Sequence, residues 1–335
     1  MIGRGALAAL LIMAGQGAAL AADCEPAPEP VYSLAYGSRY SDAGSGSSTL
    51  DESASEDVDE ALGPIDDFLR SLTAKANEVF ADDVDRRAIA DCVIGQMATW
   101  AQADAMGDLV SRTANLTIGS RLSAFGMAAL QVAPYSTRAR ELKQVKDWLN
   151  RRQRAQMTFW ETAPNGAAQG NLRAWSALGA NTIGELTNDA VMLGWSAWSA
   201  TYILCTAAPD GSLPQEMSRG RFALHYQLHA IAPLSVTAAL LHRQGMPIAD
   251  QCDGALKRVV EFAARDLENG AQSQAITGEI QTFFDGSDEI EGFNLAWIES
   301  YLTLYRDPAL EARAAPFRPL SHSKLGGDQT AIWTK

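Results

Sequence analysis

The sequence has few cysteines and histidines, and this scarcity limits the kinds of site that it can form. Its 335 residues include four Cys and four His, and no two cysteines are spaced as C-x-x-C. Structural zinc sites need closely spaced Cys and His ligands, so we expect no metal site. The sequence also lacks a phosphate-binding loop, a G-x-S-x-G segment and an H-E-x-x-H segment. No common local motif therefore assigns an activity.

Basic residues are in the minority. Lys and Arg total 27 against 40 Asp and Glu, which gives a net charge of −13. A nucleic-acid-binding protein needs a basic surface that displaces counterions from phosphates, so this balance argues against that class. A polyanionic substrate would have to bind in a local cationic pocket within this acidic protein.

The only long apolar run is at the N-terminus, at residues 6–14, and it is too short to span a bilayer. Arg4 precedes this run, and Ala19-Leu20-Ala21 follows it with the small-x-small pattern that a signal peptidase accepts. Asp23 stands before Cys24, where a lipoprotein signal would have a small residue. We therefore expect residues 1–21 to be a cleaved signal peptide and the mature protein to be exported to the periplasm.

The remaining chain divides into an irregular segment and a helical one. Residues 22–55 are rich in Pro, Ser and Gly, which predicts an extended N-terminal arm with a mobile loop. Pro64 suits the first turn of a helix, and apolar residues at helical spacing follow it. Further helices are expected at 138–161, 172–187, 190–206, 215–232, 234–244, 254–267 and 291–305. No alternating run is long enough for a sheet, so the pattern predicts an all-α fold, but it does not distinguish a bundle, a toroid and a helical-repeat array.

Side chains that could carry out chemistry are concentrated in residues 213–229. Arg219 and Tyr226 are seven residues apart, so one continuous helix would place them on nearly the same face, about 10 Å apart. His229 would lie one turn beyond Tyr226. Taken alone, this pattern is more typical of a polar helix face with a buried tyrosine than of a catalytic site.

Short segments along the chain have a familiar order and spacing. They are Ser38-Arg39-Tyr40, Ser48-Thr49-Leu50, Cys92 ahead of Trp100-Ala101, Asp210–Glu216 leading to Arg219 and Ala223-Leu224-His225-Tyr226, Leu295-Ala296-Trp297, and Leu325–Thr330. Together they resemble the mannuronate-specific alginate lyases of the bacterial periplasm. The resemblance covers most of the mature chain and implies an incomplete α/α toroid of antiparallel helical hairpins over residues 56–335. It also implies a Cys24–Cys92 disulfide, which leaves Cys205 and Cys252 either paired or buried as thiols.

Lyases of this family act by β-elimination on a uronate, without a metal or another cofactor. A base removes the C5 proton and the glycosidic oxygen leaves C4, while the carboxylate gains enolate character that positive charge and hydrogen-bond donors stabilise. The resemblance implies that Tyr226, Arg219 and Asn171 are the catalytic residues. Asn171 also suits a helix N-cap. The family's catalytic His, next after this Asn, is replaced here by Leu172. The expected substrate-binding residues are Arg39, Asn115, Trp175, Arg221 and His229.

The replacement of the family His leaves three interpretations open. In the first, Tyr226 is both base and acid, which suits β-D-mannuronate because its C5 proton and C4 oxygen leave from the same side. The substrate is then alginate, polymannuronate or a glucuronate-containing exopolysaccharide. In the second, His229 or His225 supplies the missing imidazole. In the third, the protein is a non-catalytic periplasmic toroid that binds polysaccharide, for example within an exopolysaccharide export assembly.

Overall fold

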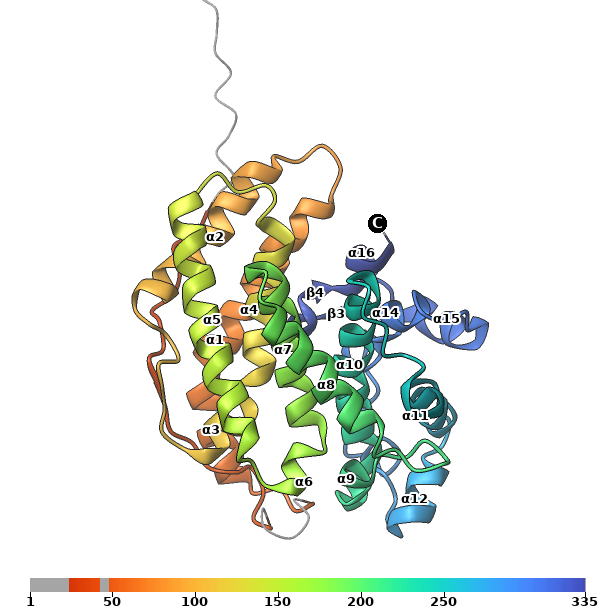
Figure 1. The fold of residues 1–335 in the computed structure, drawn as a ribbon. Helices are drawn as coiled ribbons and strands as arrows, with labels where there is room; N and C mark the ends of the chain where they lie inside the picture. The colour runs from red at the N-terminus through yellow and green to blue at the C-terminus, as the bar shows by residue number, and fades with distance from the viewer. Residues whose placement is uncertain (1–23, 43–47, 335) are drawn as a thin grey trace, which may run out of the picture.

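The computed structural model describes residues 24–42 and 48–334 (Figure 1). The expected signal peptide, residues 1–21, lies outside the described residues. The α-helices are α1 (Glu52–Asn77), α2 (Arg86–Gln102), α3 (Arg112–Thr117), α4 (Gly119–Val132), α5 (Ala139–Glu161), α6 (Asn165–Ala168), α7 (Asn171–Thr187), α8 (Ala190–Leu204), α9 (Pro214–Met217), α10 (Ala223–Arg243), α11 (Gln251–Asp266), α12 (Ala271–Thr277), α13 (Gly292–Leu295), α14 (Ile298–Leu302), α15 (Pro308–Ala314) and α16 (Gln329–Thr334).

Strands are short in the part of the chain that the structure describes. The parallel pair is β1 (Ser33–Leu34) with β2 (Asp108–Leu109), and the antiparallel pair is β3 (Ser321–His322) with β4 (Gly327–Asp328). The prediction of an all-α fold is confirmed, because these two-residue strands only fasten connecting segments to the helices.

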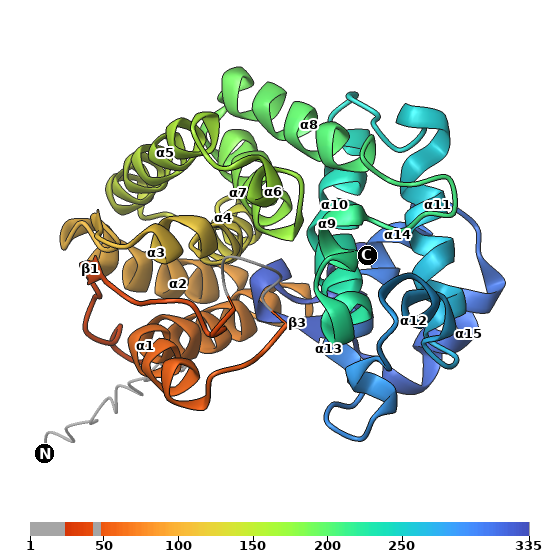
Figure 2. The same cartoon turned by 90° about the horizontal axis from the view of Figure 1, so that it is seen from below.

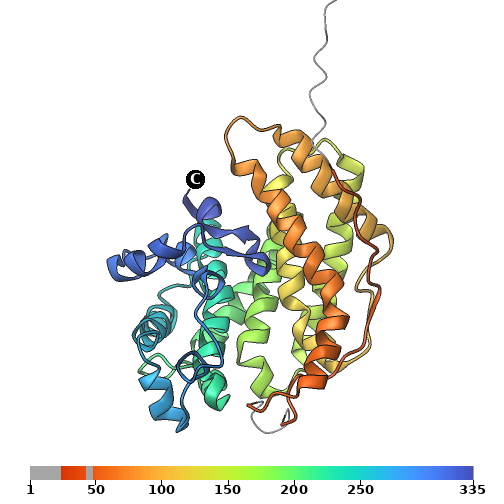
Figure 3. The ribbon, with the colours of Figure 1, turned by 180° about the vertical axis from the view of Figure 1, so that it is seen from behind.

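The helices form two groups that are joined along one side. Figure 2 shows α1 to α5 in one group and α10 to α15 in the other, with α8 bridging them. Figure 3 shows residues 24–42 running along the outside of the first group. Each group has its own hydrophobic core, and α7 contributes to both: Trp175 and Leu178 pack with the second group, and Ile183 and Leu186 with the first. This arrangement is the incomplete α/α toroid that the resemblance implies, with α7 as its central wall.

Helix α1 begins earlier than the sequence suggested. It starts at Glu52, and Asp51 caps it by accepting a hydrogen bond from the backbone N–H of Ala54. The expectation that Pro64 lies in a first turn is therefore wrong, because Pro64 lies inside α1. A proline there removes one backbone hydrogen bond, and the buried neighbours Leu62 and Ile65 hold the helix together by packing into the core.

The segment expected as one helix over 215–232 is divided. Helix α9 ends at Met217, a 3₁₀ turn (Gly220–Phe222) follows, and α10 then runs continuously from Ala223 through Pro233 to Arg243. Gly220 has a φ of +58°, a left-handed conformation that interrupts a right-handed helix and favours glycine. Arg219 therefore lies in a turn and not on the helix that carries Tyr226.

Two disulfides link distant segments. The expected Cys24–Cys92 bond is present, with the two Cα atoms 5.6 Å apart, and it fastens the N-terminal arm to α2. Cys205 and Cys252 form the second disulfide, with a Cα separation of 5.3 Å, and link the end of α8 to the start of α11.

Among the described residues, none of the helices combines the length and the apolar character needed to cross a membrane.

Candidate active site

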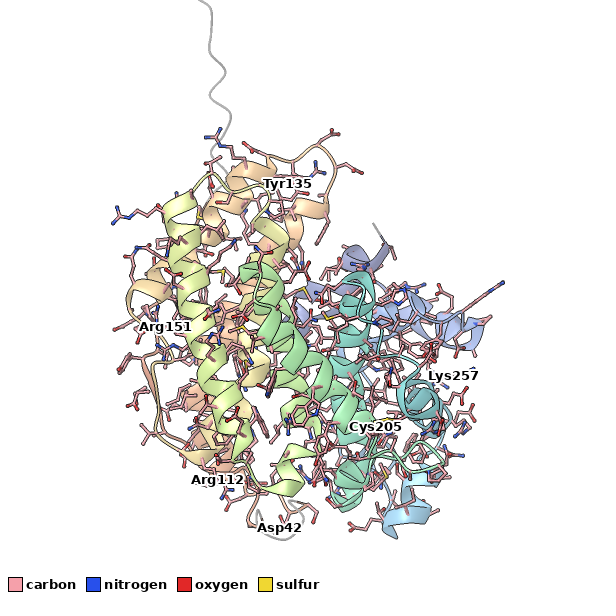
Figure 4. All side chains as sticks on the ribbon, in the orientation of Figure 1. Asp42, Arg112, Tyr135, Arg151, Cys205 and Lys257 are labelled. Atoms are coloured by element: carbon pink, nitrogen blue, oxygen red, sulfur yellow. A yellow bond between two sulfur atoms is a disulfide. The ribbon has the colours of Figure 1, made fainter. Side chains whose placement is uncertain are left out.

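A cleft of about 970 Å³ lies where the N-terminal arm, the start of α7 and the start of α10 meet. Residues 36–40 of the arm, the segment 112–121 and the turn before α7 form its walls. Figure 4 labels Arg112, one of the lining residues, at the same end of the molecule as Asp42. A neighbouring cavity of about 560 Å³ shares His229 and Lys324 with the cleft.

The cleft is cationic although the protein is acidic. Among the residues that the structure describes, the lining contains five Lys or Arg side chains and no Asp or Glu. The five are Arg39, Arg112, Arg121, Arg219 and Lys324. The protein as a whole has a net charge of −13. The local cationic pocket that a polyanionic substrate requires is therefore present, and it is at this cleft.

Tyr226 lies at the centre of a compact group in the cleft. The guanidinium carbon of Arg219 lies 3.7 Å from the centroid of the Tyr226 ring and 4.9 Å from that of Tyr40. The hydroxyls of Tyr40 and Tyr226 are hydrogen-bonded to each other. Burial, with Tyr226 close by, raises the pKa of Tyr40, so Tyr40 stays protonated and can donate to the Tyr226 oxygen. The arm thus supplies a hydroxyl donor, and the turn before α10 a cation, to the same phenol.

Asn171 is positioned by a buried carboxyl that the sequence reasoning missed. Glu216 Oε1 accepts a hydrogen bond from the Asn171 backbone N–H at 2.7 Å, and Oε2 accepts one from Asn171 Nδ2 at 2.9 Å. Glu216 is fully buried, and burial raises its pKa to about 7 even though the two hydrogen bonds act to lower it. Asn171 is the first helical residue of α7, and Gly170 is the N-cap. The Asn171 side chain therefore binds Glu216 and does not cap the helix.

Leu172 lines the cleft, and no imidazole stands at its position. His229 lies nearby, but its Nε2 atom accepts a hydrogen bond from Trp175 Nε1 at 3.0 Å. The Nδ1 atom then carries the ring proton, so the one nitrogen lone pair that a base would use is occupied. Burial also lowers the pKa of His229 well below its ordinary value. Trp175 is among the residues that line the cleft, but its side chain is only 1% exposed, so it positions His229 more than it offers a ring face to a sugar.

A second cationic group lies beside this centre and was not predicted. Asp66 accepts hydrogen bonds from Arg121 Nε at 2.9 Å and Nη2 at 2.6 Å, and Lys324 Nζ lies 3.4 Å from the same carboxylate. Two cations therefore share one anion, which leaves a net positive charge at the cleft wall. Burial lowers the pKa of Lys324 to about 8, so this charge is present at neutral pH.

Of the remaining expected binding residues, one lines the cleft and two do not. Arg39 lines the cleft and is paired with Asp59 at 2.6 Å. Asn115 is not in the described lining, and its amide donates to the backbone oxygens of residues 109 and 111. Arg221 is not in the described lining either, and it pairs with Asp285 at 2.6 Å. The amide of Asn115 and the charge of Arg221 thus stabilise local structure.

The sequence is similar to those of known lyases. The family model described as alginate lyase matches residues 47–273. An alginate lyase of Pseudomonas syringae pv. syringae is 26% identical over 321 residues, which cover 92% of this chain and 82% of that protein. An alginate lyase of Pseudomonas aeruginosa is 25% identical over 327 residues, which cover 94% of this chain and 86% of that protein.

Solved structures support the same fold. Alginate lyase A1-III from Sphingomonas species A1 matches with a TM-score of 0.76 and 22% identity, over 94% of this chain and 88% of that one. A variant of alginate lyase A1-III in complex with a tetrasaccharide matches with a TM-score of 0.79 and 23% identity, over 94% of this chain and 87% of that one. With a family model that spans well over half of the residues, the chain belongs to the alginate lyase family and is a polysaccharide lyase, a carbon–oxygen lyase for uronate polymers.

Proposed function

We propose that the protein cleaves alginate, polymannuronate or a glucuronate-containing exopolysaccharide by β-elimination, with Tyr226 as the group that moves the proton. The observation that carries this proposal is the placement of Arg219 3.7 Å from the Tyr226 ring, beside Tyr40, in a cleft whose described lining is cationic. A non-catalytic binding protein would need the cationic cleft, but it would not need a tyrosine held by both a cation and a second hydroxyl.

The proposed reaction needs no group besides these side chains. Tyr226, as phenolate, accepts the C5 proton of the uronate, and the C5–H electron pair forms the C4–C5 double bond as the C4–O bond breaks. The protonated Tyr226 then returns its proton to the departing oxygen, which restores the phenolate. Tyr40 donates a hydrogen bond to the phenolate, while Arg219 and Asn171 bind the carboxylate as it gains enolate character.

We propose further that the protein acts in the periplasm after removal of residues 1–21. The expected arm 22–55 then precedes the toroid domain 56–335, with the boundary moved to Asp51 because α1 begins at Glu52. The two disulfides support this location, because such bonds persist in oxidising compartments. An exopolysaccharide export assembly is the partner that this location would bring within reach.

The experiment that tests the activity follows the new double bond. Purified protein is mixed with polymannuronate, alginate, glucuronan and hyaluronan in parallel, and the ultraviolet absorbance of the unsaturated product is recorded. We expect absorbance to rise with at least one D-uronate polymer. No rise with any of the four, together with retained polymer binding, would establish the non-catalytic interpretation instead.

The pH dependence distinguishes the tyrosine mechanism from one that uses His229. Ionised Glu216 accepts both hydrogen bonds from Asn171, and its pKa is about 7, so protonation at lower pH removes one acceptor. We expect kcat/KM to fall as the pH decreases through about 7. This decrease of kcat/KM at low pH should persist in His229→Gln and disappear in Glu216→Gln. The Glu216→Gln substitution should also lower kcat/KM by about tenfold, because Asn171 loses its orientation. A decrease that disappears with His229→Gln would show that the imidazole acts as the base.

A further inference from the structure

Helix α8 presents an apolar face to solvent. Its sequence from Ala190 to Leu204 contains no charged residue, yet Trp198 is 56% exposed and Val191 is 63% exposed. A tryptophan side chain this exposed loses much of the stabilisation that burial would give it. The outer face of α8 therefore has a feature that the packing of the fold does not explain.

Trp198 is part of an ordered stack. Its ring lies against that of Tyr202, with the centroids 5.7 Å apart and the planes within 14° of parallel. The guanidinium carbon of Arg173 lies 4.5 Å from the Trp198 centroid and 5.3 Å from the Tyr202 centroid. Arg173 Nε donates to Ser199 Oγ at 3.2 Å, and no carboxylate in the described part of the chain pairs with Arg173. We call Trp198 and Tyr202, with Arg173 beside them, the aromatic platform.

The aromatic platform adjoins the cleft across α7. Asn171 and Arg173 are two residues apart on this helix, which turns their side chains about 200° from each other. Asn171 lines the cleft, so Arg173 points to the opposite side. Gln169 Nε2 donates to the Tyr202 hydroxyl at 3.1 Å, and Ala167, two residues earlier, lines the cleft. A polymer that leaves the cleft over the turn before α7 would reach Tyr202 first.

We propose that the aromatic platform is a second polysaccharide site, which binds a pyranose ring of an anionic polymer by stacking on Trp198. Parallel aromatic rings offer a flat apolar surface that matches the face of a sugar ring. Arg173 is buried, at 4% exposure, and no carboxylate of the described residues pairs with it, so its charge acts next to the rings and favours an anionic sugar over a neutral one. The aromatic platform takes no part in the elimination. This proposal therefore rests on the proposed function only for the kind of polymer that the aromatic platform binds.

Binding is tested in a background that cannot consume the polymer. Tyr226→Phe protein is run through native gels containing polymannuronate or glucuronan, alone and combined with Trp198→Ala, Trp198→Phe or Val191→Ala. Val191→Ala is the matched control, because Val191 is a similarly exposed apolar residue on the same helix. We expect Trp198→Ala to weaken retention by about fivefold, Trp198→Phe to restore most of it, and Val191→Ala to change nothing.

Kinetics with Tyr226 intact separate the aromatic platform from the cleft. Trp198→Ala should lower kcat/KM for the long polymer and leave that for a tetrasaccharide unchanged, because a short chain in the cleft does not extend over α8. Equal retention and equal kinetics of Trp198→Ala and the wild-type protein would overturn the second site while the lyase activity stands. If the wild-type protein forms no unsaturated product from any polymer, the proposed function fails, whereas Trp198-dependent retention in the gels would still support the second site.

Discussion

Replacing Tyr226 with Phe should lower kcat on the preferred uronate polymer by more than about 10²-fold, because the phenol oxygen carries the proton in both halves of the reaction. Phenylalanine keeps the ring against Arg219, so the cation–ring contact and the local packing are preserved. The loss should appear in kcat more than in KM, since no substrate-binding charge is removed. The measurement is initial rate by ultraviolet absorbance over a range of polymer concentrations.

Tyr40→Phe is the matched control for this substitution. It removes the other hydroxyl of the same hydrogen-bonded pair, and with it only a donor to the phenolate. We expect a loss of about tenfold, the size of one hydrogen bond to a charged group. The melting temperature shows whether Tyr226→Phe is folded. If it is unchanged and the variant is nearly as active as the wild-type protein, the mechanism is ruled out. Equal losses in the two variants would leave the proton carrier undecided between the two tyrosines and so would refute the assignment to Tyr226 alone.

Replacing Arg219 with Ala should lower kcat/KM by about 10²- to 10³-fold, as expected for removal of a preorganised charge at a developing anion. Arg219→Lys keeps the charge but loses the planar group that stacks on Tyr226 and Tyr40, so it should recover only part of the activity. The readout is kcat/KM on polymer, measured together with thermal stability.

Arg221→Ala serves as the control for Arg219→Ala. The two arginines are close in sequence, but Arg221 is paired with Asp285 and is not in the described lining of the cleft, so its removal should leave kcat/KM within about twofold. If Arg219→Ala had as small an effect as Arg221→Ala, the carboxylate would have to be held by another cation. Arg121 and Lys324 would then be the candidates, because they share a single carboxylate at the cleft wall.

Helix α7 shows how far sequence patterns lead. Apolar periodicity predicted a helix over 172–187, and the structure has it over Asn171–Thr187. This agreement follows from burial, because α7 packs into both cores and most of its residues are buried, polar ones included. The toroid itself was predictable only from the resemblance, since helical periodicity does not specify how helices are arranged.

The contact between Arg219 and Tyr226 shows where such reasoning fails. Their spacing on one continuous helix predicted a separation of about 10 Å, whereas the structure brings the guanidinium carbon to 3.7 Å from the ring. The left-handed turn at Gly220 folds Arg219 back over α10, and helical periodicity does not reveal such a turn.

Glu216 and Lys324 were not predicted as site residues because their partners are distant in sequence. Glu216 binds Asn171 from 45 residues away, and Lys324 meets Asp66 across 258 residues. No local motif contains both members of either pair. Glu216 does lie in Asp210–Glu216, one of the segments that carry the resemblance. That was the only indication of a role for it in the sequence, and it gave no reason to expect a buried carboxyl.

The contrast between the cationic cleft and the acidic remainder of the protein makes polymer capture depend on ionic strength. With a net charge of −13, the molecule repels a polyanion at long range, while the basic side chains of the cleft attract it at short range. Salt at about 0.1 M limits the reach of exposed charges to about 10 Å but screens partly buried ones much less. Salt added to a dilute buffer therefore weakens the repulsion first and the attraction only at higher concentrations. The rate of capture should pass through a maximum between these two regimes.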